Sequence, residues 1–361
     1  MINVTKSYFP QREKLDQYID RIYASGWMTN NGKLLDELEQ RLKEFLGVEY
    51  LVLVTNGTLA LQVAYHVLGI KNEVITTPFS FVATTNSLLW ENLTPVFVDI
   101  DPLTFNIDPS LIERAITPRT SAILAVHVFG NACDVERLEL IRKKYNLKIV
   151  YDAAHAFDVS DGKSNVLQFG DASILSFHAT KIFHTIEGGA IILHSEEEYK
   201  KAKLLINFGI SDYDKVDILG INCKMNEFQA AMGLAVLDEF EQIAIGRKKV
   251  WVKYLDAFRS NPNIQLQFSS SRFMNNHSYF PIVFDNEATL LTIKKDLNLQ
   301  NIFPRRYFYP SLNQLDYLEH SAQCPVSESL AKRILCLPIF PDLDGNIQDQ
   351  IIKIIFEKLT Q

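Results

Sequence analysis

The stretch Ser173–Ala190, SILSFHATKIFHTIEGGA, joins two apolar runs through a polar turn. The first run delivers Ser176, His178 and Lys181 into the turn, and Glu187-Gly188-Gly189 leads into the second run. A single lysine is nearly always a solvated surface charge. A lysine held among apolar groups has a lowered pKa instead, and its amine can form an imine with a carbonyl compound. The segment therefore predicts a turn between two buried strands that carries a reactive amine.

Similar apolar runs recur through the first 200 residues and alternate with helical patterns such as Thr58–Leu68 and Asp134–Tyr145. Most of these runs are nearly continuous, which is typical of strands covered by helices on both faces. We expect strands at Leu51–Val54, Glu73–Thr76, Thr94–Asp99, Ala122–Val128, Lys148–Asp152, Ala172–Phe177 and Ala190–His194. The alternation predicts an α/β fold with a mostly parallel sheet.

The pattern changes from about Asn226. Residues 226–240, NEFQAAMGLAVLDEF, have apolar residues at helical spacing and continue into the basic stretch Arg247–Val252. This predicts one long helix that leads out of the large domain. We expect a large domain over residues 1–244 and a smaller domain over residues 245–361. Loops of the smaller domain are expected at the proline-containing pairs Phe303-Pro304, Tyr309-Pro310 and Leu337-Pro338.

Composition excludes several classes of function. A chain of 361 residues is too long for one small core, and its net charge of −7 argues against a nucleic-acid partner. Residues 1–6 lack the apolar run of a signal peptide, and no stretch approaches the about 20 apolar residues of a membrane span. We therefore expect a cytoplasmic protein without a membrane segment.

The cysteines and histidines do not indicate a metal site. Cys133, Cys223, Cys324 and Cys336 are far apart and form no CxxC pair, which predicts reduced and mostly buried thiols. The spacings of His127, His155, His178 and His184 fit no common zinc pattern. We expect no metal.

Two further segments carry polar residues where a predicted strand ends. In Val54–Thr58, VTNGT, the glycine permits a tight turn and the following helix offers unpaired N–H groups, which suits a phosphate. An ordinary Asn-Gly turn is the alternative. Asp152, in KIVYDAAHAF, stands at the sheet edge where open α/β sheets place ligands. It is either a helix N-cap or the partner of a pyridinium nitrogen.

The sequence SFHATK followed by EGGA resembles the DegT-type nucleotide-sugar aminotransferases, and the resemblance covers essentially the whole chain. The other matching segments follow in order: Gly26–Gly32, Thr55–Thr58, Thr77–Thr84, Pro95–Asp99, Val126–Gly130, Gly220–Ala231 and Leu335–Pro338. The resemblance implies the aspartate-aminotransferase (type I) fold, with a mostly parallel seven-stranded sheet in the large domain and a smaller C-terminal α+β domain. It also implies pyridoxal 5′-phosphate (PLP) as the cofactor.

The resemblance assigns roles around the cofactor ring. Lys181 would be the catalytic residue, which binds PLP as a Schiff base and moves the proton between Cα and C4′. Asp152 would pair with the pyridine nitrogen, and Phe81 would stack on the ring. His155 replaces a glutamine that is often found there and would lie near the phenolate oxygen.

The resemblance also assigns residues to the phosphate and the substrate. Gly57, Thr58 and Ser176 would bind the phosphate, and Asn222 would reach the phosphate of the neighbouring subunit in a homodimer. The substrate candidates are Thr29, Asn30, His178, Arg306 and Tyr309. His178 could equally be a satisfied polar residue of a buried loop, and the stretch 304–310, PRRYFYP, is either a contact for a diphosphate and a base or a packed loop with two solvated arginines.

Two positions depart from the family pattern. Ser80 replaces a threonine, and Lys224 stands where arginine is frequent. Neither is expected to take part in the Schiff-base chemistry. The local contact that arginine makes at this position in the family is not assumed for Lys224.

The resemblance implies transfer of an amino group from L-glutamate to a nucleotide-linked keto-sugar. Glu187-Gly188-Gly189 resembles the branch that aminates C4, whereas relatives acting at C3 tend to carry Gly-Asp-Gly-Gly. We expect dTDP-4-keto-6-deoxyglucose as acceptor and dTDP-4-amino-4,6-dideoxyglucose as product, for a bacterial surface polysaccharide such as O-antigen. The alternatives are a C3-aminating enzyme, a PLP-dependent sugar 3-dehydratase and a non-catalytic PLP-binding regulator. A dehydratase would carry histidine in place of Lys181, and a regulator would have no chemical need for Lys181, Asp152 and Ser176 together.

Overall fold

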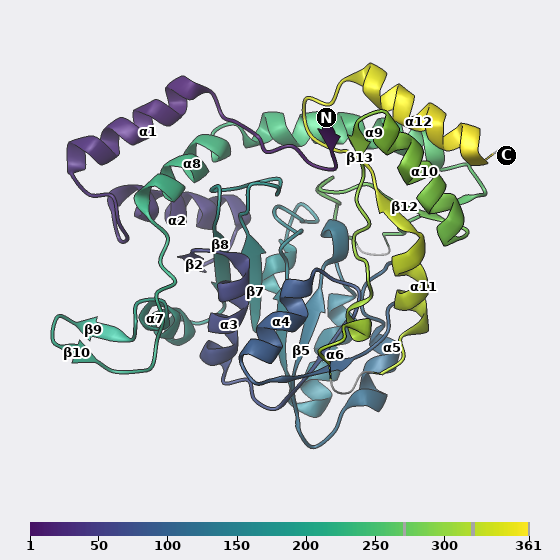
Figure 1. The fold of residues 1–361 in the computed structure, drawn as a ribbon. Coiled ribbons are helices and arrows are strands. Elements are labelled where there is room, and N and C mark those ends of the chain that lie inside the picture. Colours follow the sequence, from purple (N-terminus) through teal and green to yellow (C-terminus); the bar gives the residue numbers. More distant parts are fainter. Residues whose placement is uncertain (270–271, 319–321, 360–361) are drawn as a thin grey trace.

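A computed structural model describes residues 1–269, 272–318 and 322–359, and its centre is a seven-stranded sheet between two layers of helices (Figure 1). In spatial order the strands are β2 (Tyr50–Val54), β8 (Gly189–Leu193), β7 (Ala172–Ser176), β6 (Lys148–Asp152), β5 (Thr120–Val126), β3 (Glu73–Thr76) and β4 (Thr94–Phe97). Neighbouring strands are parallel except at β8, which runs antiparallel to both β2 and β7. The predicted mostly parallel sheet is confirmed.

Alternate residues of each strand face opposite helical layers. In β2, Leu51 and Leu53 pack toward one layer, and Val52 and Val54 pack toward the other. The first layer contains α2 (Lys33–Leu46), α6 (Val135–Tyr145) and α8 (Glu227–Leu237), and the second contains α3 (Gly57–Leu68), α4 (Val82–Trp90) and α7 (Glu196–Leu205). Because both faces are covered, the strands are apolar almost throughout.

The predicted strand at 122–128 ends two residues early, at Val126. The chain turns there through a short 3₁₀ segment, η2 (Val128–Gly130), in which Phe129 has a left-handed backbone with φ of 60°. A strand cannot continue through that conformation. The other predicted strands and the two predicted helices are present, with small differences at their ends.

The C-terminal part has a sheet and a core of its own. Its antiparallel strands are β11 (Ile264–Leu266), β12 (Pro281–Phe284) and β14 (Ile334–Cys336), and its helices are α9 (Phe240–Phe258), α10 (Glu287–Leu299), α11 (Pro325–Arg333) and α12 (Gly345–Leu359). Residues such as Phe258, Ile282 and Ile355 form the core between them. The boundary between residues 244 and 245 stays a prediction, and α9 runs across it.

The N-terminal segment connects the two parts. Strand β1 (Ile2–Asn3) pairs in parallel with β13 (Ile302–Phe303) of the C-terminal part, and the chain then crosses to α1 (Arg12–Ser25) beside α8 (Figure 1). The remaining elements are α5 (Pro109–Ile112) and a hairpin of β9 (Ile210–Asp212) and β10 (Lys215–Val216), which projects from the body next to α7.

The prediction of one long helix from Asn226 was wrong. Helix α8 ends at Leu237 and α9 begins at Phe240, with Glu239 between them at φ −116° and ψ 9°. Glu239 is only 1% exposed, and its carboxylate accepts a hydrogen bond from the Tyr8 hydroxyl at 2.7 Å and contacts Lys14 Nζ at 3.1 Å. A buried carboxylate needs such partners, and the break at Glu239 accompanies this contact with the N-terminal segment.

The four cysteines are buried thiols, as the sequence predicts. Among the residues that the structure describes, no helix is both long and apolar enough to cross a membrane.

Candidate active site

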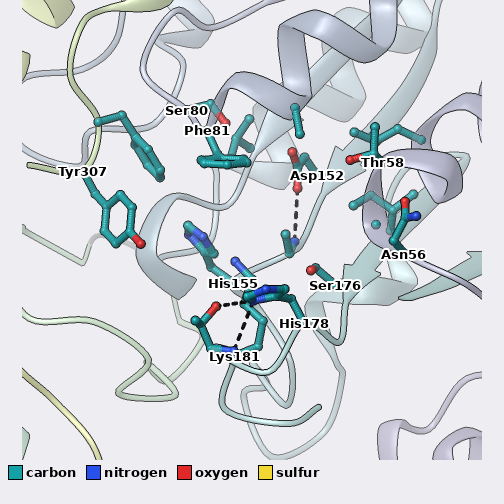
Figure 2. A pocket seen from close by; sticks show the side chains of 18 of the residues that line it. Asn56, Thr58, Ser80, Phe81, Asp152, His155, Ser176, His178, Lys181 and Tyr307 are labelled. Atoms are coloured by element: carbon teal, nitrogen blue, oxygen red, sulfur yellow. Dashed lines mark hydrogen bonds between the residues drawn. The ribbon is translucent and has the colours of Figure 1, made fainter. Parts of the chain in front are cut away.

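An open cavity of about 280 Å³ lies at the carboxyl ends of β5, β6 and β7. The last residues of these strands, Val126, Asp152 and Ser176, line it, together with the start of α3 and Arg305, Tyr307 and Phe308 of the C-terminal part. Figure 2 shows Asn56, Thr58 and Ser176 toward one end of the cavity and Tyr307 toward the other, with Lys181 between them. Open α/β sheets place their ligands at this edge.

The end near α3 is built to hold an anion. Asn56 caps α3, and its side chain accepts a hydrogen bond from the Leu59 N–H at 2.9 Å. Gly57 and Thr58, the first residues of the helix, have no preceding turn to accept their N–H groups. A Cβ on Gly57 would lie 3.1 Å from Ser176 Cβ, so glycine lets the helix start approach the serine closely. Backbone N–H groups and a hydroxyl group thus meet where phosphates commonly bind.

Asp152 is a buried carboxylate with two hydrogen-bond donors. Thr84 Oγ1 donates to its Oδ2 at 2.7 Å, and the Ala154 N–H donates to its Oδ1 at 3.2 Å. Burial raises the pKa of Asp152, and these donors and the nearby Lys181 oppose that rise. Turns, and no helix, follow β6, so the helix N-cap alternative does not hold. The carboxylate lines the cavity and is available to a cation there.

Lys181 lies in the turn between β7 and β8. Its backbone N–H donates to the His178 carbonyl at 2.9 Å, and the side chain is partly buried in the cavity wall. Burial lowers the pKa of Lys181, and Asp152 and Tyr307 oppose this. A Cβ on Gly189 would lie 2.8 Å from the Asn56 carbonyl carbon, so this glycine lets β8 start against the α3 turn. Because its pKa is lowered, the amine loses its proton more readily than that of a surface lysine, which makes it a better nucleophile.

His155 lies in an aromatic wall of the same cavity. Its ring stacks on Phe129 and Phe308, at centroid distances of 6.1 and 5.9 Å, and packs against Tyr279 at 4.5 Å. Its Nδ1 accepts a hydrogen bond from the Phe129 N–H at 3.2 Å. Burial, and to a lesser degree Lys181, hold the pKa of His155 well below its ordinary value. The neutral ring therefore carries its proton on Nε2, which can donate a hydrogen bond.

The remaining predicted residues divide into two groups. Phe81 and His178 line the cavity, and His178 Nε2 is 3.6 Å from Glu187 Oε1, which also lines it. Thr29, Asn30 and Asn222 do not line it. Asn222 is exposed and its Oδ1 accepts from Lys224 Nζ at 2.8 Å.

The residues of the segment 304–310 that line the cavity differ from the two that were predicted, Arg306 and Tyr309. Arg306 is ion-paired with Glu287 at 2.6 Å and lies against the Tyr309 ring, outside the cavity. Arg305 lines the cavity, and its Nη1 donates to the Tyr307 hydroxyl at 3.2 Å. The arginine that faces the cavity is thus the neighbour of the predicted one.

Sequence reasoning also missed several lining residues, namely Asn56, Ser80, Thr180, Glu187, Tyr279, Arg305, Tyr307 and Phe308. All of these except Tyr279 lie within the motifs of the sequence analysis or within the stretch 304–310, so position in those segments is the signal that indicates them. Tyr279 has no local signal, because it reaches the cavity from the C-terminal part.

These groups together fit PLP. The cavity offers an anion-binding helix start for a phosphate, a buried carboxylate for a pyridinium and a desolvated amine for an aldehyde. The fold and the site define the class of type I PLP-dependent enzymes.

The chain belongs to the DegT/DnrJ/EryC1/StrS aminotransferase family, whose profile matches residues 10–356. It is 45% identical over 361 residues to a dTDP-4-amino-4,6-dideoxy-D-glucose transaminase of Shigella dysenteriae, covering 99% of this chain and 98% of the relative. It is 39% identical over 370 residues to a transaminase of the same name from Escherichia coli, covering 99% of each. The protein is therefore a PLP-dependent sugar aminotransferase.

Solved structures have the same fold. The structure of DesI in the presence of its TDP-sugar product is 33% identical, with a TM-score of 0.91 over 99% of this chain and 92% of that one. NtdA from Bacillus subtilis with bound PMP is 28% identical, with a TM-score of 0.89 over 97% of this chain and 82% of that one. The predicted fold class and cofactor are confirmed.

Proposed function

We propose that this protein transfers the amino group of L-glutamate to C4 of dTDP-4-keto-6-deoxyglucose. The product, dTDP-4-amino-4,6-dideoxyglucose, would serve the synthesis of a bacterial surface polysaccharide such as O-antigen. The observation that carries the proposal is the 45% and 39% identity, over nearly all of each chain, to two transaminases named for that product. The buried thiols also support the expected cytoplasmic location, because secreted proteins commonly pair their cysteines.

PLP, when bound, supplies the electron sink that stabilises the carbanion of transamination. In the proposal, Lys181 holds the cofactor covalently and moves the proton between Cα of the amino acid and C4′. Asp152 keeps the pyridine nitrogen protonated by pairing with it. The N–H groups of Gly57 and Thr58, with the Ser176 hydroxyl, bind the phosphate. These roles are supported by the burial of Asp152, the lowered pKa of Lys181 and the helix start at Gly57.

The walls of the cavity orient the cofactor and the sugar. Phe81 would cover one face of the ring, and the Nε2–H of His155 would donate to the phenolate oxygen. For the diphosphate of the substrate the geometry favours Arg305 over Arg306, because Arg305 lines the cavity while Arg306 is held by Glu287. His178, which also lines the cavity, would contact the sugar.

The position of the new amino group is the direct test of the substrate. C3 and C4 amination need the sugar in different orientations over the same cofactor, so a few pocket side chains can decide the outcome. Incubation of a panel of keto-sugar nucleotides with PLP and glutamate should convert dTDP-4-keto-6-deoxyglucose, and NMR of the product should place nitrogen on C4. Nitrogen on C3, formed only from the 3-keto isomer, would overturn the substrate proposal and leave the PLP site standing.

We also propose that the functional unit is a homodimer in which Asn222 reaches the phosphate of the partner's cofactor. Asn222 is exposed and lies outside the cavity of its own chain. The segment that precedes it in the sequence carries several exposed apolar side chains. These include Phe208, Tyr213, Val216, Leu219 and Ile221, on and beside the β9–β10 hairpin that projects from the body (Figure 1). Exposed apolar residues gathered in one region are typical of an interface.

Mixing two inactive variants tests the shared site. Lys181→Ala and Asn222→Ala subunits, exchanged at random, should form mixed dimers with one site that holds both native residues. If Asn222→Ala alone is severely impaired, the mixture should recover about a quarter of wild-type activity, because half of the dimers are mixed and half of their sites are intact. Absence of recovery after verified subunit exchange, or an active monomer in light scattering, would contradict the shared site.

A further inference from the structure

A chain of two buried hydroxyl groups leads to Asp152. Thr84 Oγ1 donates to Asp152 Oδ2 at 2.7 Å, and Ser80 Oγ lies 2.6 Å from Thr84 Oγ1. Thr84 is fully buried, and Ser80 is almost so. Thr84 belongs to the first turn of α4, whereas Asp152 ends β6, so the bond joins two elements beside the cavity that Asp152 lines.

The direction of both hydrogen bonds follows from the chemistry of the groups. An ionised carboxylate can only accept, so the single proton of the Thr84 hydroxyl points to Asp152. Thr84 Oγ1 then has only lone pairs left for Ser80, and Ser80 must donate to it. The order Ser80 to Thr84 to Asp152 is therefore fixed as long as Asp152 is charged.

Asp152 depends on such donors. Burial disfavours its charged form, and the Thr84 hydroxyl is the strongest of the groups that oppose this. The other direct donor is the Ala154 N–H, at the longer distance of 3.2 Å. Within the described ranges, no cationic side chain forms an ion pair with Asp152, and Lys181 acts on it only through space.

We propose that Thr84 is a positioning residue for transamination. Its hydroxyl holds Oδ2 of Asp152 in one direction and favours the ionised carboxylate that a protonated pyridine nitrogen needs, and Ser80 orients that hydroxyl. The inference rests on the proposed role of Asp152. Ser80 is then two hydrogen bonds from the cofactor's partner, although the sequence placed it outside the chemistry.

The chain offers a matched control at the next residue. Thr85 is also fully buried on α4, but its hydroxyl has no hydrogen-bond partner within the described part of the chain. Thr85→Val and Thr84→Val therefore make the same chemical change in the same helix, and only the second removes a donor to Asp152. Thr84→Ser keeps the hydroxyl and loses only a methyl group.

The test measures the dissociation constant of PLP for the full-length variants from mildly acidic to mildly alkaline pH. Binding needs an ionised Asp152, so affinity falls below the pKa of Asp152 in the free protein. Loss of the Thr84 donor raises that pKa and moves the fall to higher pH. Thr84→Val should weaken PLP binding by about ten- to a hundredfold at the acidic end and by less at the alkaline end. Thr84→Ser and Thr85→Val should follow the wild type, and Ser80→Ala should move the fall in the same direction by a smaller amount.

Different outcomes separate the inference from the function on which it rests. If Asp152→Asn weakens PLP binding and Thr84→Val does not, the role of Thr84 is overturned and that of Asp152 stands. If Asp152→Asn itself has no effect, the proposed role of Asp152 fails. A loss that is equal at every pH, or equal in Thr84→Val and Thr84→Ser, shows a packing effect and contradicts the inference. If thermal unfolding shows that Thr84→Val is not folded, the pH dependence of PLP binding by Ser80→Ala tests the inference instead. A fall in affinity at higher pH than in the wild type supports the inference, and a wild-type profile contradicts it.

Discussion

Lys181→Ala is expected to lower transaminase turnover by about 10⁴-fold while the protein remains folded. The substitution removes the amine that holds the cofactor and moves the proton, and loss of a positioned acid–base group alone costs up to about that factor. PLP should still bind, weakly and without covalent linkage, because Asp152 and the start of α3 are intact. The measurement is 2-oxoglutarate release from glutamate and keto-sugar, with thermal unfolding to verify the fold.

Lys163→Ala is a suitable control, since Lys163 lies on an exposed loop away from the cavity. It should leave turnover and PLP binding unchanged. Turnover of Lys181→Ala within tenfold of wild type would mean that another group carries the proton.

Asp152→Asn is expected to lower turnover by about two hundred- to five thousandfold. The change keeps the shape of the side chain but removes the charge that pairs with the pyridinium, and breaking a buried ion pair costs about 3–5 kcal/mol. The free energy of unfolding should not fall, because the carboxylate is buried at a desolvation cost that raises its pKa. Steady-state kinetics and urea unfolding measure the two effects separately. Near-normal turnover would leave Asp152 with only its structural hydrogen bonds from Thr84 and Ala154.

The sheet could be predicted because its strands are buried on both faces. Runs such as Lys148–Asp152 and Glu73–Thr76 have an apolar interior with a polar residue at each end, and their ends in the structure match the prediction. Lys181 could be predicted for a related reason. A lysine between two such runs cannot reach bulk water easily. Because parallel strands end at the same edge of the sheet, a lysine that follows one of them lies near the residues that end the others.

Features that depend on contacts distant in sequence could not be predicted. The break between α8 and α9 accompanies the contact of Glu239 with Tyr8, 231 residues away, and the local helical pattern continues across it. In the pair Arg305-Arg306, the ion pair of Arg306 with Glu287 of α10 holds Arg306 away from the cavity, and Glu287 lies 19 residues away in the sequence. Thr84 has no local sequence signal, because its partner Asp152 lies 68 residues away at the end of β6.

The covalent attachment of PLP is the most direct test of the role of Lys181. The PLP-loaded protein is reduced with borohydride, digested and mapped by mass spectrometry. The reduced cofactor is expected on the peptide that contains Lys181, and Lys181→Ala protein should carry none. A cofactor mapped to another lysine, with Lys181 unmodified in the active wild-type protein, would contradict that role.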